Sequence, residues 1–286
     1  MKTIDLHTHT VCSDGSMTAR ELVRHAKESG LSAVAVSDHD SVDGVADALD
    51  EGKRIGIEVI PAIELSAQSN TETHILGYFI DTENPALREK LRYARTVRDE
   101  RQNEICQKLN GLGFAVSMDE VRELAGSDIL CRAHFARLMV KKGYVGSVKQ
   151  AFDEYLANGR PAFSGREALT DAEAVRLING AGGMAFCAHL HLTRKTGAEL
   201  EEFLLRLKAE GLAGVEGYYT EYTPQMQEEY QSLAARLGLC ISGGTDFHGA
   251  FKPHISIGKG LGNMAIPYSV LENMKKAYAE RKGKQI

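Results

Sequence analysis

Short apolar runs alternate with helical patterns over the first 81 residues of the chain. In residues 18–30 the apolar positions Ala19, Leu22, Val23 and Ala26 fall on one face of a helix that can end at Gly30. The intervening runs are rich in β-branched residues and short enough to be strands. The pattern therefore predicts helices at 18–30 and 42–56 and strands at 3–6, 32–37, 57–65 and 73–81.

The same alternation resumes near residue 169. Thr170 and Glu173 have the spacing of a capping box at the start of one helix, and Thr223 followed by Pro224 starts another. Repeated strand–helix units predict a parallel α/β fold, and seven or so units indicate a closed barrel. The predicted elements are strands at 183–192, 213–219 and 239–242 and helices at 170–180, 199–211 and 223–238.

Residues 95–165 break this rhythm, because their apolar positions follow a helical period with no strand between them. We interpret this stretch as a helical insertion that sets substrate choice, and residues 1–94 and 166–286 as a discontinuous barrel domain. Within the insertion, Arg95, Arg98 and Arg101 recur at helical spacing. These arginines could extend an anion-binding track, but the acidic residues interleaved with them favour simple exposure.

Composition narrows the class of protein. With 43% hydrophobic and 26% charged residues, the 286-residue chain is typical of a globular protein with a sizeable core. Its five cysteines are scattered and form no C-x-x-C pair, which favours reduced thiols and a cytoplasmic location. No apolar run is long enough to cross a bilayer and no leader precedes His7, so no membrane partner is expected. A net charge of −5 argues against a surface for duplex DNA.

Residues of the types that bind metals stand at the predicted carboxyl ends of strands or in the loops after them, except His74, which begins its strand. In a barrel these ends converge on one face. Imidazole and carboxylate groups without a thiolate suit Mn²⁺, Fe²⁺ or Zn²⁺, and so many ligands exceed what one ion takes. We therefore expect two or three divalent ions, held by His7, His9, Asp14, His39, Glu64, His74, His189, Asp246 and His248.

The motifs HTHT…SDG, SDHD, AIELSA, HILGY, AHLH and GGTDFHG together resemble the PHP family (polymerase and histidinol phosphatase), whose members are metal-dependent phosphoesterases. The resemblance implies a distorted (β/α)7 TIM-like barrel with a trinuclear site. Leu190 stands where the family usually has proline, so His191 is an alternative ligand to His189. The implied ligand sets are His7, His9, Glu64 and Asp246 for one ion, Glu64, His74 and His189 for a second, and Asp14, His39 and His248 for a third.

The resemblance also implies a reaction. A phosphomonoester would be hydrolysed by attack of a metal-bound hydroxide, with Glu64, Asp246 and His248 at the catalytic centre. Clustered divalent ions suit this chemistry because they make hydroxide available near neutral pH and neutralise charge on the phosphoryl oxygens. Manganese is the first choice of ion, and iron and zinc are the alternatives.

The insertion motif R-x-H-F-A at residues 132–136 is similar to that of the PHP subgroup that removes the 3′-phosphate from nucleoside 3′,5′-bisphosphates or trims RNA from its 5′ end. Arg132, His134 and Arg160 are therefore candidates to bind a second, non-reacting phosphate of a nucleotide or of the 5′ end of a short RNA. Two alternatives stay open. A histidinol-phosphate phosphatase has a similar size, and an amidohydrolase cleaving C–N bonds also uses H-x-H on a barrel strand. The lack of a lysine at a predicted strand end counts against the second.

Overall fold

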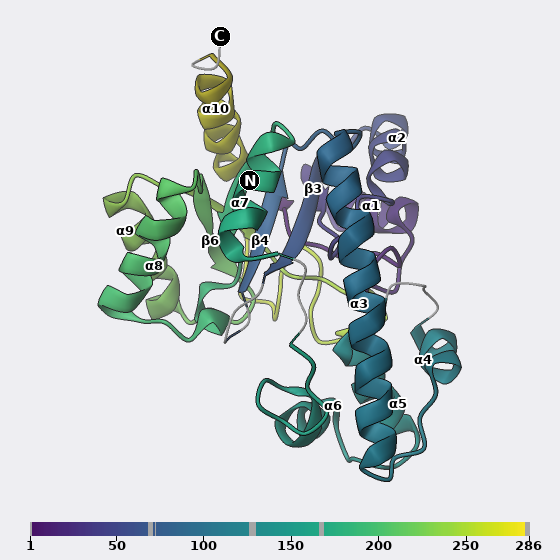
Figure 1. Cartoon of the computed structure of the whole chain (residues 1–286). Coiled ribbons are helices and arrows are strands. Elements are labelled where there is room, and N and C mark those ends of the chain that lie inside the picture. The colour runs from purple at the N-terminus through teal and green to yellow at the C-terminus, as the bar shows by residue number, and fades with distance from the viewer. Residues whose placement is uncertain (1, 68–70, 72, 126–129, 166–168, 284–286) are drawn as a thin grey trace.

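The strands of the protein form one eight-stranded sheet, seen in a computed structural model that describes residues 2–67, 71, 73–125, 130–165 and 169–283 (Figure 1). Residue 166, where the second barrel segment is predicted to resume, lies outside these residues. Two of the strands, Ala33–Val36 and Met184–Cys187, are short and buried at every position, as expected for strands covered on both faces. The strands are β1 (Thr3–Asp5), β2 (Ala33–Val36), β3 (Glu58–Ala67), β4 (Thr73–Tyr78), β5 (Met184–Cys187), β6 (Gly214–Tyr219), β7 (Cys240–Gly244) and β8 (Ile266–Pro267).

The sheet curves into a nearly closed barrel. Its strand order is β7-β6-β5-β4-β3-β2-β1-β8, and the two sides meet where the backbone N–H of Leu6 donates to the carbonyl oxygen of Gly243 at 3.1 Å. Thr8 and Phe247 form a parallel bridge just beyond this point. The predicted TIM-like α/β barrel with a helical insertion is therefore confirmed. The short strand β8, which pairs antiparallel with β1, is an addition that the sequence pattern does not predict.

Strand β4 runs antiparallel to both of its neighbours, so the expectation of a wholly parallel barrel is wrong at this position. The segment between β3 and β4 is too short for the crossover that parallel strands need. Alternation of side chains along a strand is the same in either direction, which is why the apolar pattern could not reveal this. Because β4 is reversed, its first residues lie at the rim where the parallel strands end. His74 is thereby brought to that rim, paired with Ser66 of β3.

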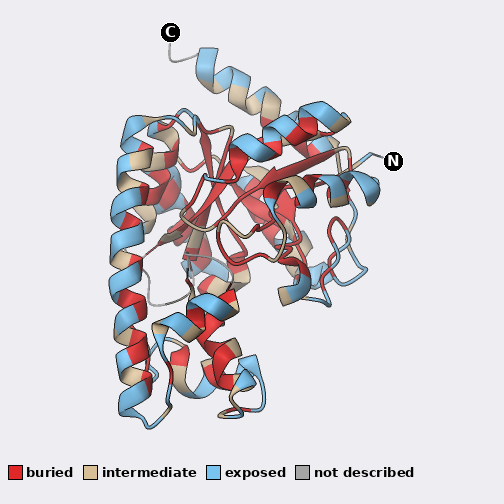
Figure 2. Ribbon diagram, turned by 90° about the vertical axis from the view of Figure 1, so that its right-hand side faces the viewer, coloured by how far each residue is buried: buried red, intermediate tan, exposed pale blue. Residues whose placement is uncertain are grey.

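Helices cover the outside of the sheet, with their exposed faces turned outward (Figure 2). Helix α1 (Ala19–Glu28) buries the four apolar residues predicted for it, and capping boxes form at Thr18–Glu21 and Thr170–Glu173. In the described ranges no helix combines the length and the apolar character that crossing a membrane requires. The other barrel helices are α2 (Val45–Ile55), α7 (Asp171–Gly180), α8 (Gly197–Ala209), α9 (Pro224–Arg236) and α10 (Ser269–Gly283).

The helical insertion lies at one end of the barrel, beside the lower half of the long helix α3 (Pro85–Gly111) (Figure 1). The first half of α3 packs on the barrel through Leu87 and Leu91. Its second half contributes Ile105 and Leu109 to a separate apolar cluster whose members all come from the segment 105–162. One continuous helix therefore belongs to both parts. The remaining elements of the insertion are α4 (Met118–Ala125), α5 (Arg132–Lys141), α6 (Val148–Ala151) and the π-helical turn η1 (Phe152–Leu156).

Gly244, the last residue of β7, lies directly against the backbone of His7, and this contact generates a prediction. A methyl group at this position would lie 2.2 Å from Cβ and 2.3 Å from the backbone nitrogen of His7, with no flexible atom to move aside. We expect Gly244→Ala to lower the free energy of unfolding by about 3 kcal/mol or more, the upper end for overpacked cores. Chemical denaturation measures the change.

Gly180→Ala is the matched control, because a methyl group there meets no atom within 4 Å. Its unfolding free energy should stay within about 0.5 kcal/mol of the wild-type value. Equal stability of the two variants would show that β7 and the His7 segment are not packed as described.

Candidate metal centre

One rim of the barrel gathers all nine residues predicted to bind metals. His7 and His9 follow β1, His39 follows β2, and Asp246 and His248 follow β7. The others come from the loop after β1 and from strands β3, β4 and the end of β5. These side chains are buried or nearly so, and they converge on a single cluster whose members are His7, His9, Asp14, His39, Glu64, His74, His189, Asp246 and His248.

Glu64 is the centre of this cluster. Its Oε2 lies 3.2 Å from Nε2 of His7, from Nε2 of His9 and from Nδ1 of His39. Its Oε1 lies 2.9 Å from Nδ1 of His74 and 3.0 Å from Nε2 of His189. Burial raises the pKa of Glu64, but the neighbouring imidazoles together, His39 and His7 foremost, hold that pKa well below its usual range. The carboxylate is therefore ionised and faces five imidazoles at once.

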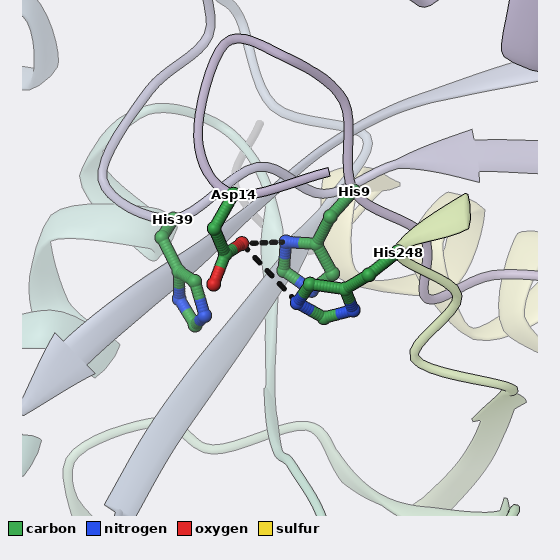
Figure 3. Close-up of side chains that lie close together, drawn as sticks. All are labelled: His9, Asp14, His39 and His248. Carbon is green, nitrogen blue, oxygen red and sulfur yellow. Dashed lines mark ion pairs between the residues drawn. The ribbon is translucent and has the colours of Figure 1, made fainter. Parts of the chain in front are cut away.

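Ligand atoms lie within 4.8 Å of one another in three overlapping groups. One group, formed by His7, His9, Glu64 and Asp246, has the same members as the first predicted ligand set. A second unites Asp14, His39 and His248 as predicted, and it also includes His9 (Figure 3). Oδ1 of Asp14 lies 3.2 Å from Nε2 of His248 and 3.6 Å from Nδ1 of His9.

The third group combines His39, Glu64 and His74, whereas the resemblance pairs Glu64 and His74 with His189. His189 nevertheless touches the same oxygen of Glu64 as His74 does. His191 lies outside the cluster and pairs with Glu221 instead, at 3.1 Å between Nε2 and Oε2. The geometry thus brings His189, and not His191, to the ions' expected position.

The donor atoms of the cluster fit divalent ions. Several of these atoms are buried and, although they lie close to one another, they make no hydrogen bond among the described residues, which would be costly if nothing else satisfied them. They are imidazole nitrogens and carboxylate oxygens, the ligand types of Mn²⁺, Fe²⁺ and Zn²⁺. The unpartnered atoms are Nε2 of His7 and His9, Nδ1 of His39 and His189, Oδ1 of Asp14 and Oε2 of Glu64.

Glu216 in β6 orients two of the histidines and is a residue that the sequence analysis missed. Its side chain is fully buried, with Oε1 2.9 Å from Nδ1 of His7 and Oε2 accepting the backbone N–H of His189 at 2.7 Å. A carboxylate on the far nitrogen of a ligand histidine fixes its tautomer and makes it a better ligand. A lone acid inside the apolar strand GVEGYY was the signal that could have revealed it.

Asp246 is held in place by two further groups that the sequence analysis missed. Its Oδ2 accepts from the hydroxyl of Tyr219 at 3.0 Å and from Nζ of Lys252 at 2.7 Å. Its Oδ1 faces the cluster, 3.1 Å from Nε2 of His9. Asp246 has a φ of 56° and His189 a φ of 22°, so both sit in the left-handed region that residues other than glycine rarely adopt. Such strain at two predicted ligand positions is typical of a functional site.

A cleft of about 900 Å³ opens over the cluster, between the barrel rim and the insertion. Of the residues proposed to bind substrate phosphate, Arg132 lines this cleft. His134 is buried behind it, and its Nδ1 accepts the backbone N–H of Cys131 at 3.1 Å. Arg160 is exposed and lies outside the cleft lining. The cationic residues of the lining are Arg98, Arg101, Arg132, Arg137, Arg194 and Lys252.

The expectation that the arginines of α3 are exposed is wrong for two of the three. Arg98 and Arg101 are 7% and 6% exposed and line the cleft, and Arg98 pairs with Asp40. Only Arg95 is exposed, where it pairs with Asp43 at 2.8 Å. Interleaved acids predict exposure for an isolated helix, but α3 turns this face toward the barrel rim.

The chain is similar in sequence and in structure to proteins of known family. A family model described as PHP domain matches residues 5–280. The chain is 33% identical over 248 residues to a 5′-3′ exoribonuclease of Haemophilus influenzae, covering 86% of this chain and 90% of that protein. It is 33% identical over 250 residues to a 3′,5′-nucleoside bisphosphate phosphatase of Chromobacterium violaceum, covering 87% and 88%. A solved structure from C. violaceum, described as an amidohydrolase with bound sulfate and no metal, matches with a TM-score of 0.86 at 30% identity and covers 96% of each chain.

The position of Glu216 generates a prediction about metal retention. Glu216→Gln keeps the size of the side chain but removes the charge that supports His7. We expect manganese affinity to fall about 10- to 100-fold, the usual effect of losing such a partner. Competition with a chelator measures it. Glu221→Gln is the control, because Glu221 pairs with His191 outside the cluster, and its manganese affinity should be unchanged. If both variants kept wild-type affinity, Glu216 would have no role in the metal centre.

Proposed function

The chain belongs to the PHP domain family and is a metal-dependent phosphoesterase, and on that premise we propose that it removes the 3′-phosphate of nucleoside 3′,5′-bisphosphates. Short RNA with a 5′-phosphate is the second proposed substrate of the same site. The observation that carries the proposal is the cleft, which joins the ligand cluster to a wall of arginines from the insertion. A substrate with two phosphates could bind one at the ligand cluster and the other at these arginines.

We propose manganese as the ion and three positions for it, with His7, His9, Glu64 and Asp246 at the first. When bound, such ions lower the pKa of a coordinated water and neutralise charge on phosphoryl oxygens. The chain's own part is to fix the ligands. Glu64 offers both oxygens to the cluster, and Tyr219 and Lys252 hold Asp246 so that its Oδ1 points inward.

The cationic wall supports a substrate with two negative groups. Arg132, at the first turn of α5, stacks over the ring of Phe163 with 5.5 Å between the guanidinium carbon and the ring centroid. Stacking keeps the planar fork oriented while its N–H groups can bind a phosphate in a bidentate way. A net charge of −5 would otherwise repel an anion, so local positive charge has to attract it.

An apolar strip in the same cleft supports a nucleoside. Val148, Phe152 and Phe163 line it on the side of the insertion, and Val148 is a large apolar residue left exposed there. Nucleobases stack on aromatic rings with useful energy and little sequence preference. Histidinol phosphate carries one phosphate and a small imidazole, so it would leave both the strip and the distal arginines unused.

Release of phosphate from a panel of phosphomonoesters, and of mononucleotide from a 5′-phosphorylated oligoribonucleotide, tests the proposal. With added Mn²⁺, we expect a nucleoside 3′,5′-bisphosphate to be turned over fastest, ahead of a 5′-phosphorylated oligoribonucleotide, histidinol phosphate and an aryl phosphate. The Asp246→Ala variant is the inactive control, because it loses a carboxylate that faces His7, His9 and His248, and it should release no phosphate from any substrate. Faster turnover of histidinol phosphate than of the bisphosphate would contradict the proposed substrate.

Arg132 gives a sharper test of how the substrate binds. Arg132→Ala should lower kcat/KM for the bisphosphate by about tenfold or more, the cost of a charge-assisted hydrogen bond, and leave aryl phosphate turnover nearly unchanged. Arg160→Ala is the matched control, because this arginine belongs to the insertion but lies outside the cleft lining. Equal losses on both substrates would assign Arg132 to folding.

A further inference from the structure

Arg137 of α5 is a cleft residue that no part of the proposed function uses so far. Its guanidinium carbon lies 3.8 Å from the ring centroid of Phe251, the tightest such stack in the described residues. Phe251 belongs to the short turn η3 (Gly249–Phe251), which directly follows His248. The stack therefore places a cation of the insertion against the barrel loop that carries two of the proposed metal ligands.

The hydrogen-bonding groups of Arg137 are not fully used. Its Nε donates to the carbonyl oxygen of Ala133 at 3.4 Å, within the same helix. Its Nη1 is buried and has no hydrogen-bond partner among the described residues. Within the same residues no carboxylate comes within ion-pair distance of it, whereas Arg98 pairs with Asp40 and Lys252 with Asp246 in the same cleft. A half-buried guanidinium with an unpartnered buried N–H group is costly unless an anion completes it.

Electrostatics place this guanidinium near the cluster. Burial lowers the pKa of Arg137, while Cys131 and Asp14 act in the opposite direction. Cys131 itself donates its thiol to Oδ2 of Asp14 at 3.5 Å. Arg137 thus lies in the field of Asp14 without a direct bond to it. An anion bound between Arg137 and the part of the cluster formed by Asp14 and His248 would pair with the guanidinium.

The two arginines of α5 face different surroundings. Arg132 and Arg137 are five positions apart, so they differ by about 140° around the helix and about 7.5 Å along it. Arg132 stacks on Phe163 of the insertion, whereas Arg137 stacks on Phe251 of the barrel. On this geometry the two arginines address different positions, one distal and one at the cluster.

We propose that Arg137 binds the phosphoryl group that reacts, through its Nη atoms and the non-bridging oxygens, with Phe251 holding the guanidinium plane. This inference rests on the proposed function, since it assigns one of the two phosphates of the substrate. Stacking occupies the faces of the guanidinium and leaves its N–H edges for the anion. Arg137 differs from Arg132 in that every phosphomonoester, with or without a second phosphate, has to meet it.

Inorganic phosphate is the probe that tests this assignment. Calorimetric titration of phosphate into the manganese-loaded protein should show affinity reduced about tenfold or more in Arg137→Met, the loss expected for charge-assisted hydrogen bonds. Arg132→Ala should keep wild-type affinity for inorganic phosphate. In parallel, kcat/KM for an aryl phosphate should fall in Arg137→Met and not in Arg132→Ala.

Arg137→Gln is the second variant, in case the methionine variant does not fold. The result is read from whichever variant holds the wild-type amount of manganese. Wild-type phosphate affinity in that variant would overturn the assignment, and so would loss of manganese from both, which would make Arg137 a structural residue. A wild-type protein that binds phosphate through Arg137 but hydrolyses none of the esters would refute the proposed function and leave the assignment of Arg137 supported.

Discussion

A buried carboxylate surrounded by imidazoles is the interaction on which this structure depends. Glu64 is 1% exposed and meets five histidines from four different parts of the chain. A charge in such a place is stable only when opposite charge and hydrogen bonds compensate for the lost water. The distant segments that form the rim of the barrel therefore have to place these five histidines accurately around Glu64. The reversed strand β4, the strained backbone at His189 and Asp246, and the close approach of Gly244 to His7 all serve that assembly.

Much of the fold and of the cluster could be predicted from the sequence, because both rest on local patterns. The apolar stripe of α1 and the capping boxes are encoded within a few residues, and the metal-binding residue types recur where strands end. The direction of β4 was missed because a side-chain period of two has no direction, although the short segment between the two predicted strands already excludes a parallel crossover. The sequence analysis also missed the supporting residues Glu216, Tyr219 and Lys252, because their role depends on which histidine or carboxylate they contact in the folded protein.

The substrate side of the cleft was the least predictable part. His134 was expected to bind substrate, yet its imidazole is buried and accepts a backbone hydrogen bond at the start of α5. Arg98 and Arg101 were expected to be exposed, yet they face the cleft. In both cases the sequence fails for the same physical reason. Whether a polar residue of a helix is solvated depends on what packs opposite it, and the barrel and the insertion meet only in three dimensions.

Helix α3 has a consequence for how the cleft can work. It runs for 27 residues without interruption, which is about 40 Å, and it is anchored in the barrel core at one end and in the core of the insertion at the other. The helix has no break at which the two parts could hinge. Because both walls of the cleft pack on this one helix, their spacing is set by how each packs on α3.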